Sequence, residues 1–170
     1  MNDLNIEKTA DSPQVECTTA GRLCIEGRAI PEDPFTFWQP VLEWVKQYAT
    51  QSQAQTEVNI YLDYINSSSS MYLNEIIRSL TTLHQNGKKV QVVWRHDEGD
   101  DTLLQLGLDI ESVVAIPFQF EAVNVDKERL QKVHIKNKKS GRISIISQKY
   151  WDAVKRNGHG GEYEVQEGNA

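Results

Sequence analysis

The chain of 170 residues contains no long apolar run and only two cysteines, Cys17 and Cys24. No stretch approaches the roughly 20 consecutive apolar residues of a membrane-spanning helix, so we expect no membrane insertion. The two cysteines have no second pair or histidine at ligand spacing, so buried free thiols are expected rather than disulfides or a zinc site. The polar, acidic segment before Val15 lacks the features of a signal or transit peptide, which predicts a cytoplasmic location.

The recognisable motifs of catalysis are also missing. The sequence has neither a Gly-x-Ser-x-Gly elbow nor a phosphate-cradling glycine loop, and its four histidines are scattered. The acidic run at residues 97–101 lacks the ligand spacing of a calcium loop, and its glycine suits an exposed turn rather than the buried setting that acid–base catalysis requires. The carboxylates of this run are Asp97, Glu98, Asp100 and Asp101. We therefore expect no metal, no cofactor and no enzymatic activity, and favour a binding or regulatory protein.

Charge is distributed unevenly along the chain. Residues 1–120 carry 8 Lys and Arg against 17 Asp and Glu, whereas residues 121–170 carry 10 against 7. The acidic first part disfavours nucleic-acid binding through bulk electrostatics, so we expect no nucleic-acid partner. The basic residues concentrate in residues 127–142, within a C-terminal extension, residues 124–170, that we expect to be partly ordered.

Hydrophobic periodicity predicts one α/β domain over residues 14–123, preceded by a disordered arm over residues 1–13. Strands separated by helices imply a single small sandwich, with a central mixed, partly parallel sheet flanked by helices. Alternating apolar residues predict strands in two pieces within 15–29 and at 56–65, 88–96 and 113–123. Apolar stripes predict helices at 35–49, at 102–110, and from the serines near residue 67 to Asn86-Gly87.

Local signals in the extension are weaker. The alternation in residues 142–147 predicts a strand, and the segment from Ser147 to Gly158 resembles a short helix with a serine cap and a glycine stop. Residues 162–170 are expected to fray.

Four consecutive serines, Ser67 to Ser70, follow Asn66 at the junction between a predicted strand and a predicted helix. Asn66 or Ser67 is suited to cap the helix, which explains one polar residue but not the remaining serines. The carboxyl end of a central parallel strand is also where open α/β sheets place their sites, and a helix N-terminus favours phosphate. A hydroxyl there is suited to carry a modification that adds about 2 negative charges.

Four segments in order resemble the SiaC-type biofilm regulatory phosphoproteins over about residues 15–120. They are GRLCIEGRAIPEDPFTFWQPVLEWV, YLDYINSSSS, KKVQVVWRHDEGDD and IPFQF. The resemblance implies a fold similar to anti-sigma-factor antagonists (STAS-like) and a non-enzymatic signalling protein. It also implies a kinase that phosphorylates a hydroxyl at the start of the helix, a metal-dependent phosphatase that reverses the step, and a diguanylate cyclase that binds the unphosphorylated form. Cyclic di-GMP and biofilm or aggregation are then the expected outputs.

The family's phosphorylated threonine corresponds to Ser67, with Ser68 as the alternative acceptor. We expect Asn66, Ser69 and Ser70 and the four carboxylates of residues 97–101 to surround the phosphorylation site and contact partners. The extension has no counterpart in the family pattern, so a second hypothesis is a constitutive interaction scaffold that uses the basic extension to bind an acidic protein, a membrane surface or RNA.

Overall fold

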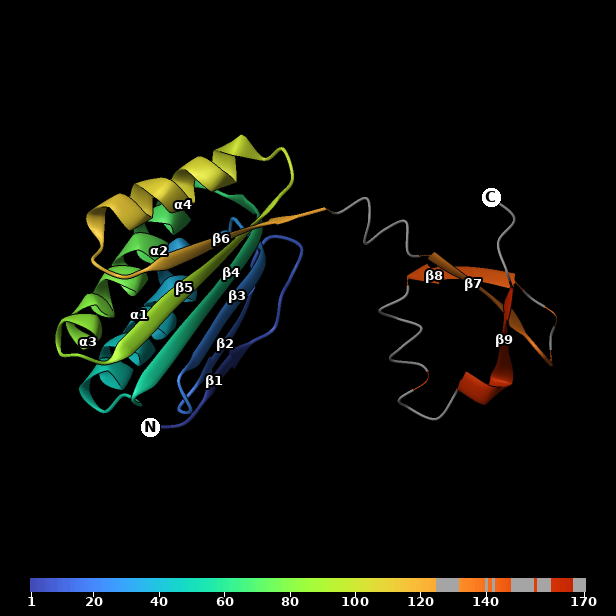
Figure 1. The fold of residues 1–170 in the computed structure, drawn as a ribbon, viewed down its shortest axis with the longest axis horizontal. Helices are drawn as coiled ribbons and strands as arrows, with labels where there is room; N and C mark the ends of the chain where they lie inside the picture. The colour runs from blue at the N-terminus through green and yellow to red at the C-terminus, as the bar shows by residue number, and fades with distance from the viewer. Residues whose placement is uncertain (125–131, 140, 142, 148–154, 156–159, 167–170) are drawn as a thin grey trace. The chain divides into compact units, whose positions relative to one another are not determined.

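The computed structural model describes residues 1–124, 132–139, 141, 143–147, 155 and 160–166. The chain divides into two compact units, Met1–Val123 and Asn124–Ala170 (Figure 1).

The first unit contains a six-stranded mixed sheet with the strand order β1-β2-β3-β4-β5-β6. The first three strands pair antiparallel, and β3 to β6 pair parallel. This arrangement confirms the predicted α/β class with a partly parallel sheet. The strands are β1 (Leu4–Ile6), β2 (Gln14–Thr18), β3 (Arg22–Ala29), β4 (Gln55–Ile65), β5 (Lys89–Asp97) and β6 (Phe118–Val123).

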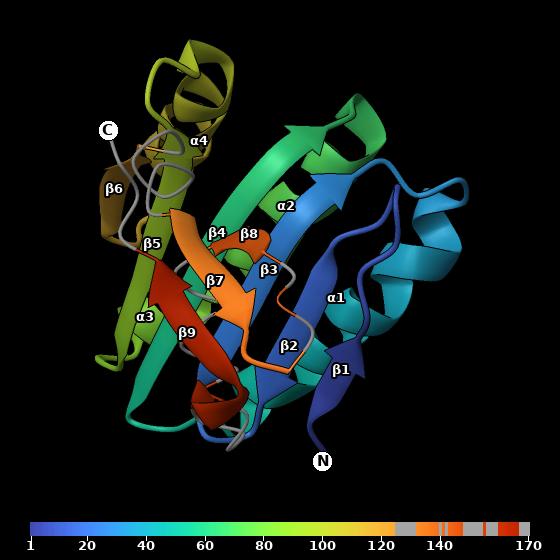
Figure 2. The ribbon, with the colours of Figure 1, turned by 90° about the vertical axis from the view of Figure 1, so that its right-hand side faces the viewer.

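Helices cover one face of this sheet, as Figures 1 and 2 show for the two long helices that follow β3 and β4. Because β3, β4 and β5 run parallel, the helices that follow them all begin at the carboxyl edge of the sheet. The helices are α1 (Pro34–Thr50), α2 (Ser67–Ser79), α3 (Thr81–Gln85) and α4 (Asp101–Val113).

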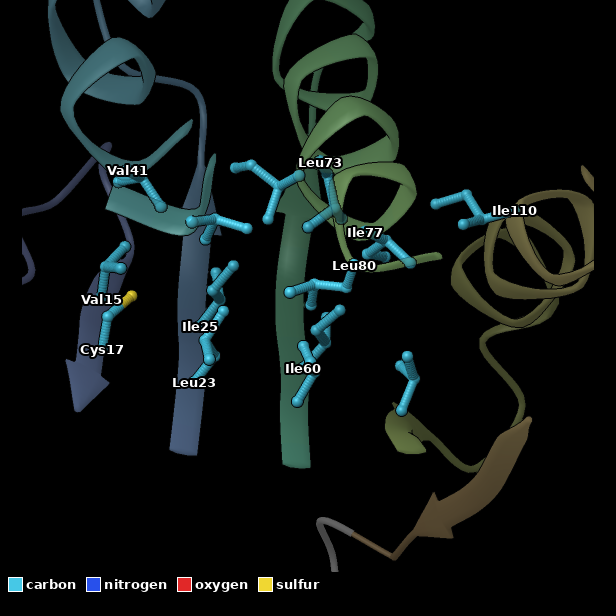
Figure 3. Close-up of a cluster of buried hydrophobic side chains, with 14 of the residues drawn as sticks. Val15, Cys17, Leu23, Ile25, Val41, Ile60, Leu73, Ile77, Leu80 and Ile110 are labelled. Atoms are coloured by element: carbon cyan, nitrogen blue, oxygen red, sulfur yellow. The ribbon is translucent and has the colours of Figure 1, made fainter. Parts of the chain in front are cut away.

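A single apolar core fills the space between the sheet and the helices. Every second residue of a strand points to this face, which is why the alternation in the sequence identifies the inner positions. Figure 3 shows the side chains of three strands meeting those of α1, α2 and α4; the labelled residues are Val15, Cys17, Leu23, Ile25, Ile60, Val41, Leu73, Ile77, Leu80 and Ile110.

Two glycines permit close approaches in the first unit. Gly21 lies in the turn that connects β2 to β3 and has a φ of +97°. A Cβ at this position would lie 2.4 Å from the carbonyl oxygen of Gln55. Gly107 lets α4 lie against Trp94, because a Cβ would come within 2.7 Å of the indole ring. The indole Nε1 in turn donates to the carbonyl of Leu103 at 3.0 Å, which fixes the first turns of α4 on the sheet.

The prediction of a disordered arm over residues 1–13 is wrong where β1 forms. Leu4–Ile6 pairs with β2, and hydrogen bonds with distant residues also hold the arm. Trp44 Nε1 donates to the carbonyl of Asn2 at 2.8 Å, and Asp3 Oδ1 accepts from the backbone N–H of Thr19 at 2.7 Å. The two partners are separated by 42 and 16 residues along the sequence, so no local sequence pattern predicts these bonds.

Two predicted elements have different limits in the structure. The strand expected over 113–123 begins only at Phe118, after Pro117, because α4 continues to Val113. The helix expected to run from the serines to Asn86-Gly87 is two helices that meet at Leu80, since α2 ends at Ser79 and α3 is a separate turn. Both stretches contain buried apolar residues, and an apolar run alone does not separate helix from strand.

The second unit contains a three-stranded antiparallel sheet in the order β8-β7-β9, with β7 (Lys132–Asn137), β8 (Ile143–Ser147) and β9 (Tyr163–Gln166). The predicted strand at 142–147 is therefore confirmed as β8. The expectation that residues 162–170 fray is wrong for β9, which pairs with β7. The helix expected between residues 147 and 158 lies outside the described residues, except for Ser147 and Lys155.

Among the helices that the structure describes, none is both long enough and apolar enough to span a bilayer.

Candidate functional site

The site begins at the turn between β4 and α2. Asn66 is the one residue between them, and its backbone N–H donates to the carbonyl of Ala29 at the end of β3, at 3.3 Å. Its backbone is extended, with φ −91° and ψ 168°, and its side-chain Oδ1 accepts from the N–H of Ser69 at 2.8 Å. Asn66 is therefore the helix cap, and Ser67 is the first helical residue rather than the cap.

Ser69 is a buried structural residue. It has no exposed surface, and its Oγ accepts a hydrogen bond of 2.9 Å from Trp38 Nε1 on α1. A buried indole N–H needs a partner, so this bond satisfies Trp38 and joins the first turn of α2 to α1. A kinase has no access to this hydroxyl without disrupting the packing of the two helices.

Ser70 is half-buried and bonded within its own turn. Its Oγ donates to the carbonyl of Asn66 at 3.0 Å, a local side-chain-to-backbone bond. Two of the four serines are thus engaged in holding the start of α2.

Ser67 and Ser68 are exposed, and neither hydroxyl makes a hydrogen bond to any part of the chain that the structure describes. They open onto different hollows of the surface. Ser67 lines a cavity of about 340 Å³ at the carboxyl edge of the sheet. Ser68 lines a groove of about 520 Å³ between α1 and α2. The two candidate acceptors are therefore distinguished by their surroundings and not by their accessibility.

The cavity beside Ser67 is formed by the first turns of two helices. Ser67 and Ser70 come from α2, whereas Thr102 and Leu103 come from α4. Helix N-termini carry partial positive charge, which favours an anion between them. Two carboxylates at the same cavity, Asp63 and Asp100, oppose that effect. The full lining is Asp63, Tyr64, Ile65, Ser67, Ser70, Asp100, Thr102, Leu103 and Leu106.

Of the predicted acidic residues, Asp100 is the one that lines this cavity. It caps α4, because its Oδ1 accepts from the N–H groups of Thr102 at 3.1 Å and Leu103 at 3.0 Å. Asp101 faces a separate shallow hollow on α4 with Gln105 and Asp109.

The other two predicted carboxylates have different surroundings. Asp97 Oδ1 accepts from the hydroxyl of Tyr61 at 2.7 Å. Glu98 is exposed, and its backbone N–H donates to the carbonyl of Val123 at 2.8 Å. Neither is among the residues that line the cavity beside Ser67. The predicted surroundings of the phosphorylation site are thus brought together only in part.

Six of the nine residues that line this cavity are absent from the sequence-based set, among them a carboxylate and an aromatic residue at the end of β4. Asp63 and Tyr64 are near the end of β4, and their position just before the serines was the available signal. The guanidinium of Arg28 lies 5.4 Å from the centre of the Tyr64 ring, which is cation–π geometry, although Arg28 itself does not line the cavity.

Comparisons with known proteins bear on the origin of this arrangement. A model of the SiaC family of regulatory phosphoproteins matches residues 6–123. The chain belongs to the SiaC family. The match covers nearly the whole first unit, which confirms the resemblance, and the second unit lies outside it.

Relatives of the SiaC-family unit come from Pseudomonas aeruginosa. An uncharacterised protein of strain UCBPP-PA14 is 28% identical over 123 residues, covering 72% of this chain and 98% of the relative. The crystal structure of apo-SiaC has a TM-score of 0.66 at 28% identity and covers 72% of this chain and all of that one. SiaC bound as an activator to the diguanylate cyclase SiaD has a TM-score of 0.67 at 28% identity, covering 71% of this chain and all of that one.

Proposed function

We propose that this protein is a non-enzymatic switch in which reversible phosphorylation of Ser67 controls binding to a diguanylate cyclase. The observation that carries the proposal is that the four serines differ in hydrogen bonding and exposure. Ser69 and Ser70 are engaged in hydrogen bonds, whereas Ser67 is exposed at the first position of α2 with its hydroxyl available. Ser68 is also exposed and is the alternative acceptor.

Phosphorylation of Ser67 changes charge more than shape. A kinase would transfer a phosphoryl group from ATP to Oγ, adding about 2 negative charges at neutral pH. The N-termini of α2 and α4 favour that charge, whereas Asp63 and Asp100 disfavour it. Because Asn66, and not Ser67, caps the helix, the modification does not remove the cap and leaves the core intact. A metal-dependent phosphatase would hydrolyse the phosphoester and restore the hydroxyl.

The proposed partner follows from the relative. SiaC of Pseudomonas aeruginosa is an activator found in complex with the diguanylate cyclase SiaD. By analogy, the unphosphorylated form of this chain would bind and activate a cyclase in the cytoplasm, where ATP and GTP are available, and so raise cyclic di-GMP and promote biofilm or aggregation. A phosphate that a bound partner must desolvate disrupts an interface, so phosphorylation would release the cyclase.

The experiment compares four full-length variants purified from the organism that encodes the chain: Ser67→Ala, Ser67→Asp, Ser68→Ala and Ser68→Asp. Phosphopeptide mass spectrometry of the wild-type protein identifies the acceptor. Mass spectrometry of bound proteins identifies the cyclase, whose production of cyclic di-GMP is then measured with each variant. We expect Ser67→Asp to lose the cyclase while Ser67→Ala and both Ser68 variants retain it. Equal binding by all four variants, or an unmodified Ser67 under every growth condition, would contradict the proposal.

A second candidate function is favoured by the separate C-terminal unit. This unit has its own three-stranded sheet and lies outside the family match, so a constitutive scaffold that uses it is the alternative. Deletion of residues 124–170 distinguishes the two functions. Cyclase binding that survives the deletion supports the switch, whereas binding that is lost with the deletion and unaffected by Ser67→Asp supports the scaffold.

A further inference from the structure

Basic side chains are scarce around the start of α2. Between residues 29 and 77 the sequence contains a single lysine or arginine, Lys46, and this residue pairs with Glu75 at 3.3 Å. The cavity beside Ser67 and the groove beside Ser68 are each lined by two carboxylates, and none of the described residues that line them is lysine, arginine or histidine. A phosphate on either serine therefore meets carboxylates, unless a basic side chain from another element reaches it.

Arg28, near the end of β3, is a basic residue in a position to do so. It immediately precedes Ala29, whose carbonyl accepts from the N–H of the helix cap Asn66. Arg28 is paired in register with Tyr64 of β4, and its guanidinium lies 5.4 Å from the centre of the Tyr64 ring. Tyr64 lines the same cavity as Ser67 and precedes it by three residues, so their Cα atoms are at most about 11 Å apart. Strand pairing thus places a guanidinium beside a residue of the cavity wall.

The side chain of Arg28 is held only weakly. It is exposed, and it forms no ion pair with the residues that the structure describes. Its guanidinium contacts Tyr64, which is itself 54% exposed, and cation–π contacts are weak at exposed sites. A guanidinium binds phosphate through two parallel N–H···O bonds, which are stronger because both groups are charged. Exchange of the aromatic contact for a phosphate contact is therefore favourable.

We propose that Arg28 is the internal receptor for a phosphate on Ser67, and that its guanidinium leaves Tyr64 to pair with this phosphate. Arg28 does not line the cavity in the unmodified protein, so its side chain must change rotamer, which exposed side chains do within nanoseconds. The pairing would offset the repulsion from Asp63 and Asp100 and would move a positive charge at the edge of the sheet. This inference rests on the proposed function, because it assigns a consequence to phosphorylation of Ser67.

The alternative acceptor Ser68 has no such receptor. Adjacent residues of a helix point about 100° apart, and Ser68 lines the groove between α1 and α2 rather than the cavity. The lining of this groove contains Asp33 and Glu75 and does not contain Tyr64. A phosphate that responds to Arg28 is therefore expected at Ser67 and not at Ser68.

Site-specific incorporation of phosphoserine tests the pairing without a kinase. Full-length protein with phosphoserine at position 67 is titrated by ³¹P NMR, which reports the second pKa of the phosphate, about 6 in the absence of perturbing groups. We expect Arg28→Gln to raise this pKa by about 0.5, because a nearby cation favours the dianion and solvent exposure moderates the effect. Asp63, Asp100 and the helix N-termini are the same in both proteins, so their influence cancels in the difference.

Two controls isolate the pairing. Arg22→Gln removes the same charge from an exposed position six residues earlier on β3, about 20 Å away and beyond the screening length of about 8 Å, so the phosphate pKa should not change. Phosphoserine at position 68 should give the same pKa with and without Arg28→Gln. Both arginines are exposed, so circular dichroism should show unchanged folding. An unchanged pKa in Arg28→Gln, or an equal rise in either control, would overturn the proposal.

The arginine side chain itself can be followed by NMR. In protein labelled with ¹⁵N at arginine, the Nε–H resonance that disappears in Arg28→Gln belongs to Arg28. Phosphoserine at position 67 should shift this resonance and slow exchange of the proton with water, whereas phosphoserine at position 68 should not. A resonance that does not respond to phosphoserine 67 would overturn the receptor assignment and leave the proposed function intact. An unmodified Ser67 in the native organism would contradict the proposed function without affecting this measurement, because the phosphoserine is incorporated during synthesis.

Discussion

The hydrogen bond between Trp38 and Ser69 provides a quantitative test of how the serine run is organised. Ser69→Ala removes the only acceptor that the described residues offer to the buried Trp38 Nε1–H, at 2.9 Å. A buried donor left without a partner costs about 1–3 kcal/mol of stability. Alanine has a higher helix propensity than serine by about 0.5 kcal/mol, which partly hides this loss.

The Ser68→Ala variant measures the helix-propensity difference between alanine and serine, which must be subtracted. Ser68 lies in the same first turn, undergoes the same substitution, is exposed and makes no hydrogen bond to the described residues. The propensity term is therefore nearly common to both variants, and the difference between their free energies of unfolding isolates the buried bond. We expect Ser69→Ala to be less stable than Ser68→Ala by about 1–3 kcal/mol.

Urea unfolding followed by circular dichroism at 222 nm measures this difference, because all the long helices that the structure describes belong to the first unit. A double-mutant cycle with Trp38→Phe then gives the coupling energy of the pair. A difference below about 0.5 kcal/mol, or a coupling near zero, would refute the conclusion that Ser69 is a structural residue.

The remaining predictions concern the cap, the sheet and the thiols. Asn66→Ala should lower the free energy of unfolding by about 1 kcal/mol in urea titrations, because the N–H of Ser69 loses its acceptor. Gly107→Ala should cost about 1–3 kcal/mol by the same assay, because a Cβ would lie within 3 Å of the Trp94 ring. Burial raises the pKa of Cys17 from about 9 to about 12, so stability should fall between pH 9 and 12, where the unfolded thiol ionises and the folded one does not, and Cys17→Ala should flatten that slope. Iodoacetamide should modify the half-buried Cys24 before Cys17.

Elements with strong local signals were predictable from the sequence. The alternating run at 56–65 corresponds to β4 (Gln55–Ile65), and the apolar stripe at 35–49 corresponds to α1 (Pro34–Thr50). The short strand β1 escaped prediction because three residues carry too little pattern and its stabilising partners are distant. The stretch at 113–117 was misassigned because its apolar residues, of which Val114 and Ile116 are buried, lie at the end of a helix and in the loop after it rather than in a strand.

The candidate site was predictable at the level of the turn but not of the individual hydroxyl. A cap at Asn66 or Ser67 follows from local chemistry, and the structure selects Asn66. The burial of Ser69 depends on Trp38, which is 31 residues earlier in the chain and contributes no local signal. Likewise, the sequence pattern does not distinguish Asp100 from Asp101, whereas in the structure Asp100 caps α4 and lines the cavity beside Ser67, and Asp101 lines a separate hollow.

The division of the serine run has a consequence for how a phosphorylated form would behave. The first turn of α2 is held by the Asn66 cap and by the buried bond from Trp38 to Ser69. Because these bonds already fix the first turn of α2, a charge added at Ser67 would change the electrostatic potential of the surface and would not unwind the helix. Local unfolding would relieve repulsion from Asp63 and Asp100 only by breaking these contacts, which costs about 1–3 kcal/mol for the buried Trp38 donor alone. Phosphorylation of Ser67 should therefore change the affinity of a partner that covers the start of α2 more than it changes the stability of the fold.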